Sequence, residues 1–217
     1  MIRAILYDLD GVLVDAVDIH KRAFNAALTT VTGKPLTDEE HLKDFNGLPT
    51  KKKLEMLIAR RKITPVMVPF IERLKQEMTI AQINELLKTD HHKTRLHRWA
   101  KMSGIKIGCV TNSIRETAEL MLKNTGQLKY MKLVITNQDV DEPKPSPEGY
   151  FKAMAMLGVK PENTLIVEDS EKGVSAAKKT GAHLLVARSC KEVNIDSIKD
   201  KIIESSFSSV WSAALSW

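Results

Sequence analysis

The stretch IRAILYDLDGVLVD, residues 2–15, decides the fold class of this 217-residue chain. Its apolar run, residues 2–7, has the length and composition of a buried β-strand, and Asp8 and Asp10 follow directly. Carboxylates do not belong inside a buried strand, whereas the carboxyl edge of a parallel sheet is where open α/β folds carry their chemistry. Side chains two positions apart in an extended chain point the same way. We therefore predict that Asp8 and Asp10 act on one reacting group.

From residue 105 onward, strand-like and helical segments alternate. This alternation predicts an α/β fold with a doubly wound parallel-sheet (Rossmann-like) core. The predicted strands are 105–110, 132–135, 164–167 and 183–186. The predicted helices between them are 114–123, 147–157 and 172–179, with a short helical turn at Pro161.

The region between the first strand and residue 92 has a helical period and no convincing strand. Helices are predicted at 19–31, 50–60, 65–76 and 80–87. We interpret residues 16–92 as a helical cap domain inserted into a core made of residues 1–15 and 93–217, with hinges at 14–17 and 89–93. The C-terminal tail, SSFSSVWSAALSW, is assigned packing on the core and no further role.

The composition is that of an ordinary soluble globular protein, with 43% hydrophobic and 28% charged residues. No apolar run approaches the roughly 20 residues that span a bilayer, and the N-terminus has no signal-type segment. The two cysteines, Cys109 and Cys190, have no metal-ligand spacing. We expect both to be reduced, which fits a cytoplasmic protein.

Basic residues exceed acidic ones by 33 to 27, giving a net charge of +6. Two basic clusters, 51–53 and 60–62, fall on one predicted helix, and a solvated helix face is the favoured interpretation. Attraction of an anionic substrate and binding of nucleic acid are the alternatives. Aromatic residues make up only 5% of the chain and do not interleave with the basic ones, so nucleic acid is disfavoured as a partner.

Polar residues follow each predicted core strand. Thr111-Asn112-Ser113 follows the second strand, Lys144 lies between two prolines after the third, and Glu168-Asp169 ends the fourth. Each group taken alone is commonly a helix cap or a solvated loop. Together, at the ends of strands in one sheet, they suit phosphoryl transfer, which needs cations, donors for phosphate oxygens and an aligned nucleophile.

The carboxylates are assigned the covalent and metal chemistry. We expect Asp8 to attack phosphorus, giving an aspartyl-phosphate that water later hydrolyses. Asp10 is expected to protonate the departing ester oxygen and then to deprotonate that water. Asp8 and Asp169, with a backbone carbonyl, offer the hard oxygen ligands that Mg²⁺ prefers, and Glu168 is expected to hold a metal-bound water.

The phosphate is expected to be bound by Thr111, Asn112 and Lys144. The Thr111 hydroxyl and the amides at the start of the following helix can receive phosphate oxygens. Lys144 adds a fixed positive charge that restrains Asp8 and neutralises the transferring group.

These motifs resemble those of the haloacid dehalogenase-like (HAD) superfamily, in its phosphatase branch with a helical cap after the first strand. The resemblance rests on DLDGVL from Asp8, the TNS triplet from Thr111, Lys144 in PKPSPEGY, and EDS from Glu168. It implies the roles above and a magnesium cofactor, with the carbonyl of Asp10 as a further metal ligand. Dehalogenase members of the family lack the second aspartate, so Asp10 argues against dehalogenation.

The cap offers candidate substrate contacts. By the same resemblance, the segment NGLPTK, residues 46–51, matches one that reaches over the active site, so Thr50 and Lys51 are candidates for a polar or anionic substrate group; a helix N-terminus is the alternative reading. Lys75 is either a cleft residue or a surface lysine. His20 corresponds to a hinge histidine of β-phosphoglucomutase, which the core and early cap also resemble. Thr50 stands where that mutase has an arginine for a second phosphate, so hydrolysis is favoured over mutase activity.

The sequence thus predicts a Mg²⁺-dependent phosphatase for a small phosphorylated metabolite, a sugar phosphate or a phosphoglycolate-like acid. A phosphosugar mutase is the alternative. Nucleic-acid 3′-end processing is disfavoured because a cap should exclude a duplex end. A catalytically dead binding module is disfavoured because Asp8, Asp10, Lys144 and Asp169 are all present. No membrane partner is expected, and the oligomeric state is left open with a monomer favoured.

Overall fold

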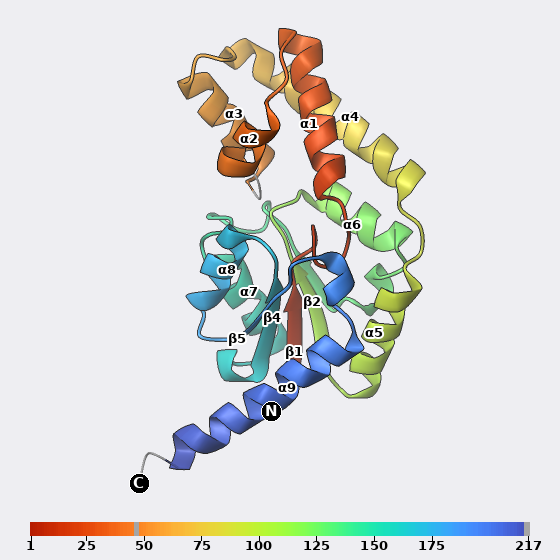
Figure 1. Ribbon diagram of the computed structural model, residues 1–217, viewed down its shortest axis with the longest axis vertical. Helices are drawn as coiled ribbons and strands as arrows, with labels where there is room; N and C mark the ends of the chain where they lie inside the picture. The colour runs from red at the N-terminus through yellow and green to blue at the C-terminus, as the bar shows by residue number, and fades with distance from the viewer. Residues whose placement is uncertain (46–47, 215–217) are drawn as a thin grey trace. The chain divides into compact units, whose positions relative to one another are not determined.

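The computed structural model describes residues 1–45 and 48–214, with side chains as far as Ser206 (Figure 1). The chain forms two compact units. Met1–Asp15 with Thr89–Trp217 make the first, here called the core unit, and Ala16–Lys88 make the second, the cap unit. Residues 89–92 belong to the core unit, because Asp90 caps a core helix by accepting a hydrogen bond from the backbone N–H of Lys93.

The core unit is built on a five-stranded parallel sheet in the order β3-β2-β1-β4-β5. This confirms the predicted α/β fold with a doubly wound parallel sheet. β1 is central, and its Ala4 lies opposite Lys106 of β2 on one side and Thr164 of β4 on the other. The strands are β1 (Ala4–Tyr7), β2 (Lys106–Val110), β3 (Leu133–Ile135), β4 (Thr164–Glu168) and β5 (His183–Val186).

Helices cover both faces of the sheet (Figure 1). On one face, Ala4 and Leu6 pack in a cluster with Tyr150 of α7 (Glu148–Leu157) and Ala176 of α8 (Glu171–Lys178). On the other, the Tyr7 ring meets His97 of α5 (His91–Met102) edge to face, with centroids 5.6 Å apart. Because both faces of β1 are covered, every residue of that strand is apolar and buried.

The sequence analysis did not predict two core helices, α5 and α9 (Ile195–Ala214). The sequence of α5, HHKTRLHRWAKM, has few apolar residues because part of its buried side is polar and basic, including Lys93 and His97. α9 packs against β5, while the side chains of residues 207–217, most of the C-terminal tail, lie outside the described part of the chain. The remaining elements are α6 (Arg115–Asn124) and the 3₁₀ turns Leu128–Tyr130, Pro161–Asn163 and Cys190–Glu192.

The cap unit is helical throughout its described residues. Its elements are α1 (Val17–Thr32), α2 (Asp38–Glu40), a π-helical turn (His41–Phe45), α3 (Thr50–Ala59), a 3₁₀ turn (Pro65–Met67) and α4 (Val68–Leu86). Two helices were predicted where α4 is one continuous helix. The hydroxyl of Thr79 bonds back to the carbonyl of Lys75 at 2.7 Å, so this polar residue sits inside the helix without ending it.

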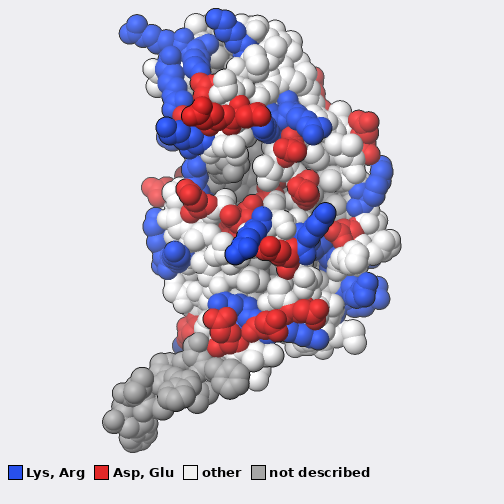
Figure 2. Space-filling view, viewed as in Figure 1, with Lys and Arg blue, Asp and Glu red and all other residues white. Residues whose placement is uncertain are grey.

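Three of the six basic side chains in the cap clusters form ion pairs, and the second cluster, 60–62, lies just after α3 and not on it. Arg60 pairs with Asp44 at 2.8 Å, Lys62 pairs with Glu40, and Lys52 pairs with Glu55 at 3.3 Å. The face in Figure 2 likewise shows red acidic side chains lying among the blue basic ones. These surface ion pairs agree with the interpretation of the clusters as a solvated face, except at Lys53, which is buried. Among the helices that the structure describes, none has the length and apolar character to cross a membrane.

Candidate active site

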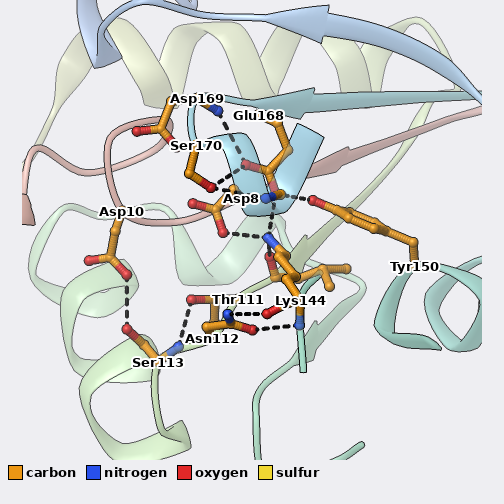
Figure 3. Close-up of polar contacts among 12 residues, drawn as sticks. Asp8, Asp10, Thr111, Asn112, Ser113, Lys144, Tyr150, Glu168, Asp169 and Ser170 are labelled. Carbon is orange, nitrogen blue, oxygen red and sulfur yellow. Dashed lines mark hydrogen bonds and ion pairs between the residues drawn. The ribbon is translucent and has the colours of Figure 1, made fainter. Parts of the chain in front are cut away.

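The carboxyl edge of the sheet brings the predicted polar residues together (Figure 3). Asp8 follows β1, Thr111 follows β2, and Glu168 and Asp169 lie at the end of β4. Lys144 reaches the same point from the loop between β3 and α7. Parallel strands end at one edge, so residues far apart in sequence meet there.

Lys144 is the hub of the site. Its Nζ donates to Asp8 Oδ1 and Glu168 Oε1, each at 2.6 Å, and to the carbonyl of Val110 at 2.7 Å. Burial alone lowers the pKa of Lys144, but the carboxylates of Asp8 and Glu168 outweigh burial and raise that pKa well above its usual range. The ammonium is therefore a permanent charge, held by three acceptors in one position.

The remaining charges at this edge are negative. Burial, together with the nearby carboxylates of Glu168, Asp10 and Asp169, raises the pKa of Asp8, although the Lys144 ammonium opposes that rise. Burial and the carboxylates of Glu168 and Asp10 raise the pKa of Asp169 to about 6. A single buried ammonium does not balance this many carboxylates, and the site suits an additional cation.

A divalent cation fits the side chains present. Ligand oxygens of Asp8, Glu168 and Asp169 lie within 4.8 Å of one another. Asp169 Oδ1 is buried and has no hydrogen-bond partner, although a buried carboxylate oxygen normally has one. Hard carboxylate oxygens are the ligands that Mg²⁺ prefers. Both the donor set and the unsatisfied oxygen therefore match a magnesium ion.

Glu168, predicted to hold a metal-bound water, is strongly engaged by the protein itself. It is fully buried and accepts hydrogen bonds from Lys144 Nζ, from the Tyr150 hydroxyl at 2.5 Å and from the Asp169 N–H at 3.2 Å. The Ser170 hydroxyl adds a contact at 3.5 Å. These contacts indicate that Glu168 positions Lys144.

Tyr150 is a site residue that the sequence analysis missed. It lies on the apolar face of α7 with Ala153, Met154 and Leu157, and it is fully buried. Its hydroxyl bonds to the same Glu168 oxygen as Lys144. The sequence signal for this role is a tyrosine on the core-facing side of an amphipathic helix, because a buried hydroxyl needs a hydrogen-bond partner.

We expect Tyr150→Phe to lower activity by several-fold and the free energy of unfolding by about 1–2 kcal/mol, because it removes one buried donor from a charged acceptor. Thermal unfolding and steady-state kinetics measure both effects. Tyr130→Phe is the matched control, since the Tyr130 hydroxyl has no hydrogen-bond partner among the described residues. Equal effects of the two substitutions would contradict a special role for Tyr150.

Two glycines, Gly11 and Gly173, leave room for the carboxylates of Asp169 and Glu168. Gly11 has φ +86°, and a Cβ there would lie 2.1 Å from Asp169 Oδ2. At Gly173, on α8, a Cβ would lie 2.0 Å from three atoms of the Glu168 carboxyl group. Both positions therefore require glycine for close approach, and Gly11 also for its backbone conformation.

Gly173→Ala is expected to destabilise the protein strongly and to reduce activity. Helix propensity alone would favour alanine by about 1 kcal/mol. The clash with Glu168 exceeds this, because overpacking a core typically costs about 1–3 kcal/mol and here displaces the partner of Lys144. Thermal unfolding shows whether the substitution lowers or raises the stability of the protein, with Ser175→Ala on the same helix as the control. A variant as stable as wild type would show that Glu168 moves freely.

The residues after β2 hold Asp10 and Lys144. The Ser113 hydroxyl donates to Asp10 Oδ2 at 2.8 Å, and Figure 3 shows the Asp10 side chain directed toward Ser113. Thr111 Oγ1 accepts a hydrogen bond from the Ser113 N–H at 3.0 Å. Asn112, predicted to bind phosphate, uses its side-chain amide on the main chain of Lys144, accepting from its N–H at 3.0 Å and donating to its carbonyl at 3.2 Å. That double contact indicates a role in placing the lysine loop.

The substrate candidates in the cap belong to the other unit. Within it, Lys75 Nζ lies 3.4 Å from His20 Nδ1. Thr50 is the first residue of α3, and Lys51 is exposed on the next position. Asn46 and Gly47, which begin the predicted substrate-facing segment, lie outside the described residues.

Comparisons with solved structures agree with this fold. The structure of CbbY from Rhodobacter sphaeroides in complex with phosphate matches with a TM-score of 0.78 and 28% identity, covering 86% of each chain. A β-phosphoglucomutase from Clostridium difficile matches with a TM-score of 0.80 over 94% of this chain and 98% of that one, and its 22% identity shows a shared fold.

Sequence comparisons extend the similarity to proteins named as phosphatases. The chain is 29% identical over 178 residues to a phosphorylated carbohydrates phosphatase of Thermotoga maritima, covering 82% of this chain and 81% of the relative. It is 33% identical over 180 residues to pyrophosphatase PpaX of Anoxybacillus flavithermus, covering 83% and 80%. The family model for haloacid dehalogenase-like hydrolases matches residues 5–187, a span that holds every core residue of the site. The motifs, the parallel sheet and these matches agree, and the chain belongs to the haloacid dehalogenase-like hydrolase family.

Proposed function

We propose that this hydrolase is a Mg²⁺-dependent phosphatase that cleaves small phosphorylated metabolites through an aspartyl-phosphate intermediate on Asp8. The observation that carries the proposal is the Asp8 carboxylate, buried at the end of β1 and fixed 2.6 Å from the Lys144 ammonium. A nucleophile beside a fixed cation is what transfer of an anionic phosphoryl group requires.

In the first half-reaction, a carboxylate oxygen of Asp8 attacks phosphorus as the bond from phosphorus to the ester oxygen breaks. Asp10 gives its proton to the departing ester oxygen, so the product leaves as an alcohol. The Lys144 ammonium offsets negative charge on the phosphoryl oxygens during transfer, and the Thr111 hydroxyl contributes a donor to them. The products of this step are the free alcohol and phosphorylated Asp8.

In the second half-reaction, Asp10, now a carboxylate, takes a proton from water. The resulting hydroxide attacks phosphorus, the acyl-phosphate bond breaks, and inorganic phosphate leaves with Asp8 restored as a carboxylate. Ser113 holds Asp10 Oδ2 at 2.8 Å, which keeps the acid/base group near this edge of the sheet. Asp10 returns to its protonated state for the next cycle.

Asp8 and Asp169, with the carbonyl of Asp10, are the residues proposed to hold the magnesium ion. When bound, the ion neutralises phosphate charge and offsets the repulsion among the carboxylates. The unpartnered Asp169 Oδ1 supports this assignment. Glu168, which already binds Lys144 and Tyr150, is proposed to support the ion indirectly.

We propose sugar phosphates or short phosphorylated acids as the substrate class. Two of the relatives described above are named for phosphorylated carbohydrates and for pyrophosphate, which are small phosphate compounds. His20, Thr50 and Lys51 of the cap unit are proposed substrate contacts, with Lys75 as a cationic neighbour of His20. Lys51 is exposed and has no ion-pair partner among the described residues.

Phosphate release from a panel of compounds tests the proposal. The panel comprises glucose 6-phosphate, fructose 6-phosphate, phosphoglycolate, pyrophosphate, nucleoside monophosphates and a 3′-phosphorylated oligonucleotide, each with Mg²⁺ or EDTA. We expect release from a small phosphate compound, dependent on Mg²⁺ and absent from Asp8→Asn. Release that persists in EDTA or in Asp8→Asn would contradict the mechanism.

The same assay separates the phosphatase from a phosphosugar mutase. A mutase returns the phosphoryl group to another carbon, so β-glucose 1-phosphate would give glucose 6-phosphate without net phosphate release. We expect net release of inorganic phosphate. Conversion that requires a sugar bisphosphate and releases no phosphate would instead establish the mutase.

A further inference from the structure

The two chain connections between the core and cap units are both anchored to one turn of the core unit. This turn, 125–127, follows α6. The N–H of Asp90, just after the boundary at Thr89, donates to the carbonyl of Thr125 at 3.1 Å. The side-chain Nε2 of Gln127 donates to the carbonyl of Leu13 at 3.0 Å, two residues before the other boundary at Asp15.

Gln127 is fully buried, and its amide is fully used. Nε2 also donates to Thr125 Oγ1 at 2.9 Å, and Oε1 lies 2.8 Å from His97 Nε2. The carbonyl of Leu13 can only accept, which fixes the amide group of Gln127 facing it. The amide oxygen of Gln127 can likewise only accept, so His97 carries its proton on Nε2.

His97 fixes the direction of its hydrogen bond to Gln127. It is buried, its ring lies edge to face on Tyr7, and its Nδ1 has no hydrogen-bond partner. Burial lowers the pKa of His97 to about 4, so the ring is neutral near pH 7. A neutral ring with its proton on Nε2 offers Gln127 a donor at all physiological pH values.

The carbonyl held by Gln127 belongs to the turn that carries Asp10. This turn, 9–14, is closed by its own backbone bonds, from the N–H groups of Leu13 and Val14 to the carbonyl of Leu9 and from Gly11 to Val14. It therefore moves as one piece, and a bond to Leu13 restrains the whole turn.

We propose that Gln127 is a positioning residue that fixes the 9–14 turn and thereby the place of Asp10 relative to Asp8. This inference rests on the proposed function, because it assigns Gln127 to the acid step of Asp10. Gln127 does not touch the reacting atoms, and it acts on the turn through the carbonyl of Leu13.

The kinetic test uses Gln127→Met, which keeps the length of the side chain and removes its hydrogen bonds. The probes are p-nitrophenyl phosphate, whose leaving group departs without a proton, and the sugar phosphate of the panel that the wild type cleaves fastest. Because kcat/KM covers only steps through departure of the leaving group, it isolates the acid role of Asp10. We expect kcat/KM to fall about tenfold or more on the sugar phosphate and by about threefold or less on the aryl phosphate, because only the Asp10 carbonyl proposed as a metal ligand affects the aryl probe.

Thr125→Val is the matched control. It removes the hydroxyl that accepts from Gln127 and donates to Met121, but it leaves the contact between Gln127 and Leu13. We expect a loss of thermal stability with kcat/KM unchanged on both probes. Gln127→Asn, whose shorter amide does not reach Leu13, serves as the second variant if Gln127→Met does not fold. The proposal is overturned if Gln127→Met loses kcat/KM equally on both probes or loses none on either. It is also overturned if Thr125→Val loses as much kcat/KM on the sugar phosphate as Gln127→Met does.

Hydrogen exchange tests the anchor without any activity. In Gln127→Met, the amides of Leu13 and Val14 are expected to exchange about five- to tenfold faster than in wild type, the effect of one lost hydrogen bond. Their exchange in Thr125→Val should match wild type. Unchanged exchange in Gln127→Met refutes the anchor. If the wild type releases phosphate from no compound, the proposed function fails, and the exchange result decides the anchor by itself.

Discussion

Asp8→Asn is expected to lose phosphatase activity by at least about 10³-fold, equivalent to about 4 kcal/mol of activation free energy. The amide has nearly the shape of the carboxylate but is not a nucleophile, so no aspartyl-phosphate forms. Steady-state phosphate release measures the loss. Acid-quenched protein after brief exposure to radiolabelled substrate should carry label in the wild type and none in the variant.

The same substitution should not unfold the protein. Burial and neighbouring carboxylates raise the pKa of Asp8, which means that the folded state disfavours its charged form. Near pH 7 that charge lowers the stability of the ion-free protein, and Asn removes it. We expect a higher Tm for Asp8→Asn than for wild type in EDTA. Asp200→Asn, at an exposed position, is the control and should change neither activity nor Tm.

Lys144→Met is expected to have the largest effect on stability. Met has similar length and no charge, so the substitution leaves Asp8 and Glu168 buried without their shared cation. Removing one partner of a buried ion pair costs about 3–5 kcal/mol, a large share of the roughly 5–15 kcal/mol that stabilises a domain. Activity should fall at least about 10²-fold, because the fixed charge beside the phosphoryl group is gone.

Denaturant unfolding and phosphate release measure these two losses. Lys160→Met, which removes a lysine with an 80% exposed side chain, should be nearly neutral. Adding Glu168→Gln to Lys144→Met should restore part of the lost stability, because it removes one of the two uncompensated carboxylates. Strictly additive destabilisation would contradict the ion-pair account of the site.

The sheet and the main site residues are predictable because both depend on local pattern. An apolar run of strand length specifies where each strand lies, and a polar residue after it is placed at the carboxyl edge by chain continuity alone. The four predicted strands after the first match the bounds of β2, β3, β4 and β5 to within one residue. Asp8, Thr111 and Asp169 therefore needed only their neighbours in sequence.

The elements that the sequence analysis missed lack such a local signal. α5 buries polar and basic residues, including Lys93, whose Nζ donates to the carbonyls of Cys190 and Val193 at 2.6 Å each. A lysine at a core position looks like a surface residue until those distant carbonyls are known. The predicted break between 76 and 80 is wrong because Thr79, in the middle of α4, is buried and bonds to the carbonyl of Lys75 within the helix.

The sequence by itself determined that Asp8, Thr111 and Asp169 lie at the edge of the sheet, and the tertiary structure decided which side chains contact one another there. Lys144 and Asp8 are 136 residues apart, and Gln127 and Leu13 are 114 apart. Glu168 became the partner of Lys144 and Tyr150 only through the packing of α7 and α8 on β4. Local pattern follows from the periodicity of strands and helices, whereas these pairings depend on strand order and on glycines that allow close approach. Such distances in three dimensions are not encoded in any short stretch of the chain.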